Sequence, residues 1–402
     1  MKLNYLYLLL ASLLIFSSCG DDDDEVMVME PVPTGNSVTY GLGPFAVEGI
    51  SGTAEFVEND DASITVNLSL VGTPSGGQHP AHVHLNTAAE GGGIAVTLGT
   101  VDGSTGESSI NITTLDDGTP ISYSEILEYD GYINVHLSAD DLGTIVAQGD
   151  IGQNAFTGTS KTYTLGEKDV EGISGSVTFN ERLNGEALAV ISLAGTPEGG
   201  SHPAHIHINT AAEGGGIAYS FNPVDGLSGI SRSNVAALDD GTSFGYADVI
   251  AYDGYINVHL SADDLATIVA QGDIGENELT GTSTTYALGE KDVTGISGSV
   301  TFSRRANGEV LAVLSLTGTP EGGSHPAHIH MNSAAEGGGI VYTFTPVDGT
   351  SGTSVSNIAA LDDGTSFGYT ELIAYDGYIN VHLSADDLAT IVAQGDIGSN
   401  AG

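Results

Sequence analysis

Apolar and polar residues alternate over short stretches along most of the chain. In the segment "SITVNLSL", Ile64, Val66, Leu68 and Leu70 stand at every second position with polar residues between them. A period of two places these apolar side chains on one face of a β-strand. The segments "GISGTAEF", "GIAVTLG", "ESSINIT" and "VAQGDI" predict further strands, separated by turns of Gly, Asp and Asn. About seven or eight strands in some 120 residues favour a two-sheet β-sandwich.

Helical patterns are scarce and short. The segment "ISYSEILEYDG" predicts a brief helical turn. The segment "SADDL" has serine at Ser138 and an acid three residues later at Asp141, a capping pattern that predicts a second helical turn. The 57 glycines agree with a turn-rich protein. The predicted fold class is therefore all-β.

The whole pattern repeats with a period of 123 residues. His79, His202 and His325 are separated by this step, as are His136, His259 and His382. A solenoid repeat spans roughly 20 to 50 residues, so a step of 123 predicts independent domains instead. We expect three tandem domains over residues 37–152, 161–275 and 284–398, with short joins that make the array a semi-extended rod.

The N-terminus predicts export and attachment to a membrane. Residues 1–18 contain Lys2, an apolar run and two small residues, as a secretory signal peptide does. Cys19, the one cysteine of the chain, then resembles the lipidated cysteine of a bacterial lipoprotein. An ordinary signal peptide that leaves an idle thiol is the alternative. Residues 19–36 form an acidic, Pro-containing tether, and its "GDDDDE" run resembles the tag that directs some lipoproteins to the outer face of the cell.

The charge of the chain excludes several classes of partner. There are 52 acidic residues against 8 basic ones, a formal net charge of −44. Removal of residues 1–18 takes away Lys2 and no acid, which leaves 52 acids, 7 bases and a charge of −45. Such a surface repels phosphate backbones and anionic headgroups, so nucleic acid is excluded and the membrane is reached only through a lipid on Cys19. Cations, basic proteins or a salty habitat fit better.

The histidines are confined to four positions of each repeat. In "AHVHLN", Ala81, Val83 and Leu85 share one face of a strand, which places His82 and His84 on the other. In "GYINVHLS", Tyr132, Asn134 and His136 likewise lie opposite Ile133, Val135 and Leu137. The candidate metal ligands of the three repeats are His79, His82, His84, His136, His202, His205, His207, His259, His325, His328, His330 and His382.

A pair of histidines at positions i and i+2 of one strand can reach one ion. The third ligand would be His136 from a neighbouring strand, and His79 would be a fourth at the strand entrance. Neutral imidazoles suit copper or zinc. The glycines after the motif would let the backbone pass close to the site. Glu90 or Asp140 would orient the ring nitrogens. The alternative is that these outward histidines only form hydrogen bonds to loops.

Other chemistry finds little support in the sequence. The acid pairs of the "LDDGT" segments, which are Asp116–Asp117, Asp239–Asp240 and Asp362–Asp363, are interpreted as turn residues, with calcium ligation as the alternative. "EGGGI" lacks the Gly-Lys-Ser/Thr of a phosphate loop, and "EGISG" lacks a nucleophile elbow. No catalytic constellation is predicted.

The "AHIH" strand, the glycine-rich turn and the "GYINVHLS…IVAQGDI" ending resemble the CHRD domain, the module named after chordin that also occurs in bacterial surface proteins. The resemblance covers each 123-residue unit, although the arginine of the family's last segment is missing here. It implies Greek-key β-sandwiches of the immunoglobulin type, a fold likened to copper/zinc superoxide dismutase. The dismutase likeness implies copper on the His-x-His strand, but a disulfide is impossible with one cysteine, and the negative surface would slow superoxide.

Together these observations predict a non-enzymatic binding or structural lipoprotein of the cell envelope, held in the outer membrane by a lipid and exposed at the surface. Each module would carry a histidine cluster able to hold copper or zinc, and an extracellular or envelope protein would be the partner. A copper-dependent, dismutase-like redox enzyme is one alternative. An adhesin or spacer without metal is the other.

Overall fold

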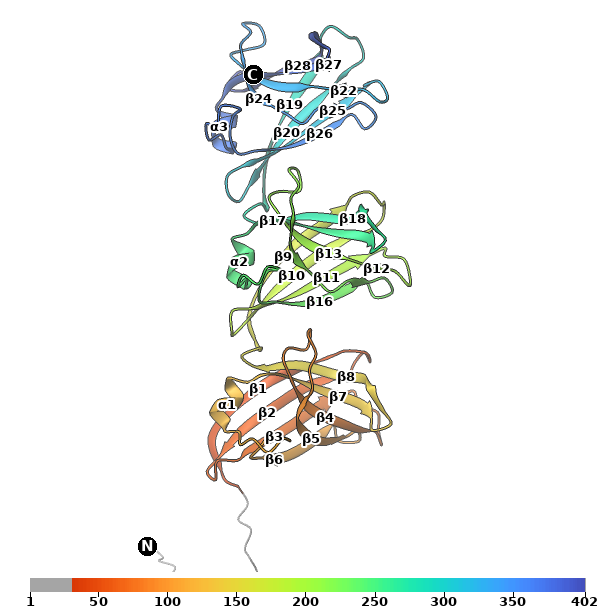
Figure 1. Cartoon of the computed structure of the whole chain (residues 1–402), viewed down its shortest axis with the longest axis vertical. Coiled ribbons are helices and arrows are strands. Elements are labelled where there is room, and N and C mark those ends of the chain that lie inside the picture. The colour runs from red at the N-terminus through yellow and green to blue at the C-terminus, as the bar shows by residue number, and fades with distance from the viewer. Residues whose placement is uncertain (1–30, 402) are drawn as a thin grey trace, which may run out of the picture.

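The computed structural model describes residues 31–401 and consists almost entirely of antiparallel β-strands in three modules (Figure 1). The prediction of an all-β fold is confirmed. The first module has eight strands and one short helix: β1 (Pro33–Pro44), β2 (Ser51–Asn59), β3 (Ile64–Val71), β4 (Gln78–Leu85), β5 (Ile94–Asp102), β6 (Glu107–Ile112), α1 (Tyr123–Leu127), β7 (Asp130–Ser138) and β8 (Asp141–Gly152). The signal peptide, Cys19 and most of the tether lie outside the described residues.

The second and third modules repeat these elements with some strands divided. The second contains β9 (Phe156–Glu167), β10 (Ser174–Arg182), β11 (Ala187–Ala194), β12 (Ser201–His202), β13 (Ala204–Ile208), β14 (Ile217–Ser220), β15 (Val224–Asp225), β16 (Ile230–Val235), α2 (Tyr246–Ile250), β17 (Asp253–Ser261) and β18 (Asp264–Gly275). The third contains β19 (Leu279–Glu290), β20 (Ser297–Arg305), β21 (Val310–Thr317), β22 (Ser324–His325), β23 (Ala327–Met331), β24 (Ile340–Thr343), β25 (Val347–Asp348), β26 (Thr353–Ile358), α3 (Tyr369–Ile373), β27 (Asp376–Ser384) and β28 (Asp387–Gly398).

The strand order is that of a Greek key. In the first module a closed barrel runs β1-β2-β3-β6-β5-β4-β7-β8. Strands β4, β5 and β6 are neighbours in sequence, and β7 returns through α1 to pair with β4. The second module keeps the same order but opens between β14 and β16. In the first module, the long connection through α1 brings β7 beside β4, although β4 lies more than forty residues earlier in the chain.

Each module has its own apolar core, built by the alternation seen in the sequence. Ile64, Val66, Leu68 and Leu70 of β3 all point inward and are buried. Three separate clusters of buried aliphatic and aromatic side chains fill the three modules. Among residues 31–401, no helix has the length and apolar character needed to cross a membrane.

The first predicted helical turn is confirmed and the second is wrong. Helix α1 begins after Ser122, whose side chain and that of Glu125 form a capping box. The pattern Ser138-x-x-Asp141 instead closes the β7–β8 hairpin, where the Asp141 N–H donates to Ser138 Oγ at 3.1 Å. The same local hydrogen bond suits a helix start and a tight turn. The residues after Asp141 decide the outcome, because they pair with β7.

Two further expectations need correction. Leu85 follows the core-facing positions of its strand but is exposed, because it lies at the end of β4. The first strand of each module also begins earlier than predicted, at Pro33, Phe156 and Leu279. Segments that the sequence analysis assigned to the tether and the joins therefore belong to strands.

The modules are stacked along one axis (Figure 1). A buried arginine lies at the first joint, where the second module meets the first. Arg182 of the second module donates from Nη1 to Asp150 Oδ2 of the first module at 2.8 Å and to the Asn154 carbonyl at 2.5 Å. Its Nε donates to Asn234 Oδ1 within its own module at 3.0 Å. The side chains of Arg182 and Asp150 are 0% and 5% exposed, so this ion pair is part of the interior of the joint.

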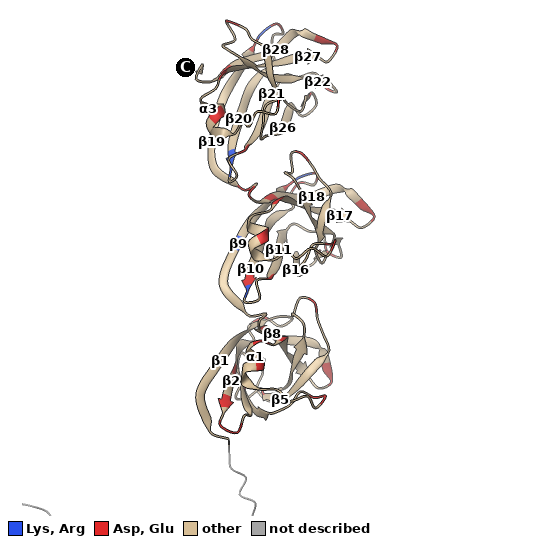
Figure 2. Cartoon of the chain, turned by 60° about the vertical axis from the view of Figure 1, so that its left-hand side comes forward, with Lys and Arg blue, Asp and Glu red and all other residues tan. Residues whose placement is uncertain are grey.

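The second joint repeats the first. Arg305 pairs with Asp273 at 2.7 Å and also binds the Asn277 carbonyl at 2.6 Å. The first module has Asn59 at the corresponding position, where it bonds to Ser63 and Thr65 of its own module. The two arginines account for a quarter of the eight basic residues of this acidic chain, whose acids are spread over all three modules (Figure 2).

Candidate metal centre

Strands β4 and β7 pair side by side and bring three histidines together in the first module. In this register His82 lies opposite Asn134 and His84 opposite Tyr132. His136 follows on β7, beyond Val135, which is paired with Ala81. The ring of His136 lies 5.1 Å from that of His82 and 6.2 Å from that of His84, measured between centroids. The predicted contribution of one histidine from a neighbouring strand is therefore confirmed.

All three modules contain the same cluster. In each, one ring nitrogen from every histidine lies within 4.8 Å of the corresponding nitrogens of the other two. Tetrahedral ligands at the usual zinc–nitrogen distance are about 3.3 Å apart, so the rings need to close by little more than an ångström to hold an ion. The three histidine clusters are His82–His84–His136, His205–His207–His259 and His328–His330–His382.

The histidines are buried, which differs from the expected outward-facing cluster. They lie on the strand face opposite the apolar core, yet His82, His84 and His136 are only 9%, 8% and 6% exposed. Tyr132 covers part of the cluster, because its ring stacks on that of His84 at 5.0 Å between centroids. Covering side chains and loops keep most solvent from the rings, so polar contacts among them are stronger than at an open surface.

Backbone carbonyls bind Nδ1 of two of the three rings and so leave Nε2 of those rings as the free nitrogen. His84 donates from Nδ1 to the Gly92 carbonyl at 3.0 Å, and His136 donates from Nδ1 to the Leu142 carbonyl at 2.7 Å. In this tautomer Nε2 carries a free lone pair, as a metal ligand must. The Nε2 atoms of both residues and Nδ1 of His82 are buried and find no hydrogen-bond partner within residues 31–401.

The glycine run after the histidine strand lets the backbone pass close to the cluster, as predicted. A Cβ atom on Gly92 would lie 2.0 Å from the Leu85 carbonyl oxygen, so only glycine fits there. Its N–H donates to the Tyr132 hydroxyl at 3.2 Å, while its carbonyl binds His84. Gly215 and Gly338 meet the same obstruction in the other modules. The loop that follows β4 is thereby held against the cluster.

Burial favours the neutral form of two of the three imidazoles in each cluster. It lowers the pKa of His82 below its usual value of 6.5, the neighbouring His136 and His84 lower it further, and Asp116 opposes the shift. Burial also lowers the pKa of His136, against the Leu142 carbonyl, which favours its protonated form. The corresponding histidines of the other modules shift in the same direction. Neutral imidazole is the form that binds copper and zinc.

His79 does not join the cluster, contrary to the expectation of a fourth ligand. Its Nδ1 lies 3.2 Å from the His136 carbonyl, so it bonds to the backbone that carries a ligand. Its Nε2 faces Gly77, where a Cβ atom would lie 2.4 Å away. His202 and His325 repeat the contact with the carbonyls of His259 and His382. These three histidines position strand β7 and its counterparts.

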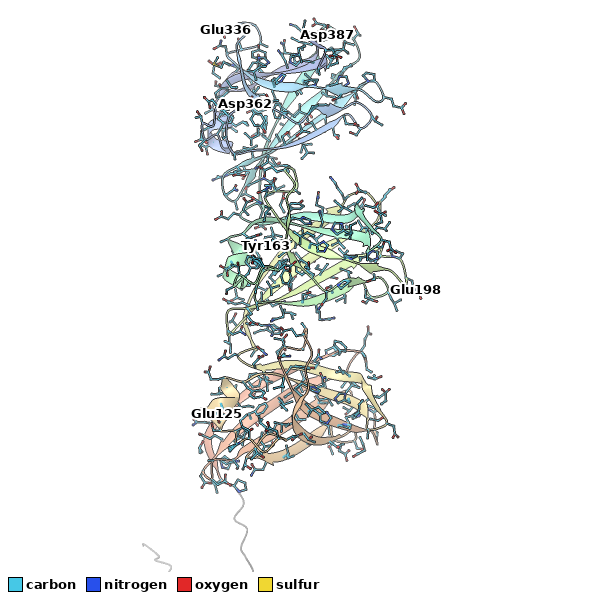
Figure 3. All side chains as sticks on the ribbon, in the orientation of Figure 1. Glu125, Tyr163, Glu198, Glu336, Asp362 and Asp387 are labelled. Atoms are coloured by element: carbon cyan, nitrogen blue, oxygen red, sulfur yellow. The ribbon has the colours of Figure 1, made fainter. Side chains whose placement is uncertain are left out.

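The expected carboxylate partners are also not near the ligand nitrogens. Glu90 Oε2 accepts from Thr87 Oγ1 at 2.7 Å and so closes its own loop. Glu336, its counterpart in the third module, lies in a loop at the end of that module (Figure 3). Asp140 is an exposed turn residue. Gly92 and Leu142 orient the rings through backbone carbonyls, which no side-chain pattern in the sequence could reveal.

The "LDDGT" aspartates are turn residues, as interpreted from the sequence. Asp117 accepts from the Thr119 N–H at 2.8 Å within the turn. Asp116 accepts from Thr97 N and Oγ1 at 3.0 and 2.8 Å. Thr97 is paired with His82 across β4 and β5, which explains how Asp116 acts on the His82 ring. A negative charge therefore stands beside each cluster.

Comparisons with known protein families, characterised proteins and solved structures give no match to this chain.

Proposed function

We propose that this protein is a non-enzymatic surface lipoprotein whose three modules each hold one copper or zinc ion. The observation that carries the proposal is that the three clustered histidines of the first module each have a buried ring nitrogen with no hydrogen-bond partner within residues 31–401. Leaving such a nitrogen unpaired costs about 1–3 kcal/mol. An ion bound by all three would remove that cost. The same histidine cluster recurs in the other two modules, although in the third His330 Nε2 lies 3.5 Å from Asn380 Nδ2.

The remaining parts of the proposal rest on the sequence. The signal peptide, lipidation of Cys19 and the outer-membrane location follow from residues 1–24, and CHRD-type modules follow from the quoted motifs. The partner would be an extracellular or envelope protein. A bound ion would supply a positive charge and a Lewis-acid centre in each module, within an otherwise acidic surface.

A copper-dependent, dismutase-like enzyme remains the alternative proposal, and the charges count against it. Two of the four arginines, Arg182 and Arg305, are buried at the joints and are not available to guide an anion. The 52 acidic residues would slow the approach of superoxide. Copper-loaded protein that dismutates superoxide faster than the same amount of free copper would favour the enzyme.

Metal content of the purified mature chain tests the proposal. We expect three equivalents of copper or zinc per chain, and two equivalents when His82, His84 and His136 are replaced by alanine. Replacement of the exposed Asp140 by asparagine is the control and should leave three equivalents. Unchanged metal content in the triple variant would overturn the proposal, as would a wild-type chain that retains neither ion. In both cases only hydrogen bonding to loops would be left for these histidines.

A further inference from the structure

A cleft separates the first and second modules on one side of the arginine joint. Its volume is about 600 Å³, within the usual range for small-molecule sites. Both modules contribute to its walls. The side chains that the argument uses are Phe45, Ala88 and Asp150 from the first module and Phe156, Leu188 and Arg232 from the second.

Two half-exposed phenylalanines give the cleft an aromatic lining. Phe45 is 50% exposed and Phe156 is 46% exposed, which is unusual for the largest apolar side chains of this chain. Phe156 is held from behind by the buried guanidinium of Arg182, 5.2 Å from its ring centroid. Phe156 is therefore supported by the same arginine that joins the two modules.

Arg232 adds a positive charge to this apolar surface. Its guanidinium carbon lies 6.0 Å from the centroid of the Phe45 ring, across the joint. Within residues 31–401 it forms no ion pair, although the chain has 52 acids. Asp150, the acid in the cleft wall, is already paired with Arg182. The cleft therefore has one uncompensated positive charge.

The second joint lacks this combination. A step of 123 residues from Phe45, Phe156 and Arg232 leads to Lys168, Leu279 and Val355. The cavity recorded beside that joint is smaller, about 400 Å³, and is lined by Tyr163, Asp273 and Glu278 among others. The buried arginine–aspartate pair occurs at both joints. The two phenylalanines and the unpaired arginine occur at the first joint and not at the second.

We propose that this cleft binds a small planar aromatic anion, such as an aromatic carboxylate or sulfonate. The aromatic body would pack on Phe45 and Phe156, and the acid group would pair with the fork of the Arg232 guanidinium. A guanidinium binds two oxygens of a carboxylate or a sulfonate through two parallel hydrogen bonds, which a lysine cannot provide. The proposal is independent of the metal centres, because the cleft contains none of the clustered histidines.

Binding of 1-anilinonaphthalene-8-sulfonate to the mature chain tests this site. The chain has no tryptophan, so dye fluorescence reports binding without interference from protein emission. We expect one strong site per chain. Arg232→Ser, which introduces the residue of the first module at this position, should weaken binding at least tenfold. Phe156→Leu, the residue of the third module, should also weaken it. Lys168→Ala at the second joint is the matched control and should change affinity less than twofold.

An uncharged dye of the same shape, N-phenyl-1-naphthylamine, separates recognition of the anion from simple apolar binding. The wild-type chain should bind it at least tenfold more weakly than the sulfonate, and Arg232→Ser should remove most of that difference. Equal binding of the two dyes by the wild-type chain would overturn the proposal. So would an Arg232→Ser variant that binds the sulfonate as well as wild type. A chelator should leave sulfonate binding unchanged, which separates this result from the test of the metal centres.

Discussion

At the scale of single residues, the hydrogen bond made by one nitrogen of a histidine ring determines whether the other nitrogen can bind a metal. His84 and His136 donate hydrogen bonds from Nδ1 to the carbonyls of Gly92 and Leu142, so Nε2 keeps a lone pair that can bind a metal. His79 belongs to the same sequence motif, but its Nδ1 bonds to the His136 carbonyl and its Nε2 packs on Gly77. Residue type alone therefore does not distinguish a ligand from a positioning residue.

The histidine pKa shifts predict how stability depends on pH. Burial lowers the pKa of two histidines per module, six in all, below the value of about 6.5 expected in the unfolded chain. Below pH 6.5 the unfolded chain binds more protons than the folded chain, so stability falls as pH falls. The contribution is complete above pH 6.5 and is lost as pH drops through the folded pKa values.

Denaturant midpoints of the metal-free protein between pH 7.5 and 5.5 measure this effect, with a chelator present throughout. His82→Asn with His136→Asn should reduce the slope by about a third, because two of six shifted groups are removed. Replacement of the exposed Asp140 by asparagine is the control. A wild-type midpoint that does not fall over this range would contradict the prediction.

At the scale of elements, a short sequence pattern determines a helix or a turn only when the residues that follow it favour the same structure. Helix α1 has a complete capping box, whereas α2 and α3 begin at Gly245 and Gly368 without a side-chain cap. The Ser138 pattern looks similar in sequence but closes a hairpin, because Asp141 begins strand β8. Strand pairing outweighs the local preference of a single serine.

Substitution of Ser122, the N-cap of α1, tests how much the capping box contributes to the stability of the helix. Ser122→Ala should destabilise α1 by about 1 kcal/mol, because the Glu125 N–H keeps only the Ser122 carbonyl and the Glu125 carboxylate loses the Ser122 hydroxyl, while Ser122→Gly should cost only a few tenths. Amide hydrogen exchange at Glu125 and Ile126 reports the change directly. Ser69→Ala, which changes an exposed serine of β3, serves as the control. Equal exchange in Ser122→Ala and wild type would show that packing alone holds the helix.

At the scale of the whole molecule, the joints depend on buried charge. Arg182 and Arg305 each cross from one module into the preceding one and bond to an aspartate and a carbonyl. A buried ion pair contributes little net stability when compared with apolar residues, but removing one partner leaves the other charge buried. The relative placement of the modules is therefore sensitive to single substitutions at these two positions.

Arg182→Ala should destabilise the first joint by about 3–5 kcal/mol, because Asp150 loses its partner while remaining buried. We expect a lower thermal midpoint and a broader distribution of molecular dimensions in small-angle scattering. Addition of Asp150→Asn should recover part of the loss. Arg304→Ala, an exposed arginine next to Arg305, is the control. Scattering and melting curves identical to wild type would mean that the short connection alone orients the modules.

Features that depend on local periodicity could be predicted from the order of residues alone. Alternation in β3, β4 and β7 identified the core residues and placed His82 and His84 on the opposite face, and the 123-residue step identified three copies. These properties follow from the chain's own geometry, because successive side chains of a strand point to opposite sides.

Contacts between segments that are far apart in the chain became visible only in the folded protein. The Greek-key return brings His136 beside β4, the glycine loop and Tyr132 bury the cluster, and His79 is turned away from it. The same holds for Arg182, whose partner Asp150 belongs to another module. Pairings of this kind depend on the packing of whole strands and modules, and no short-range pattern in the sequence records them.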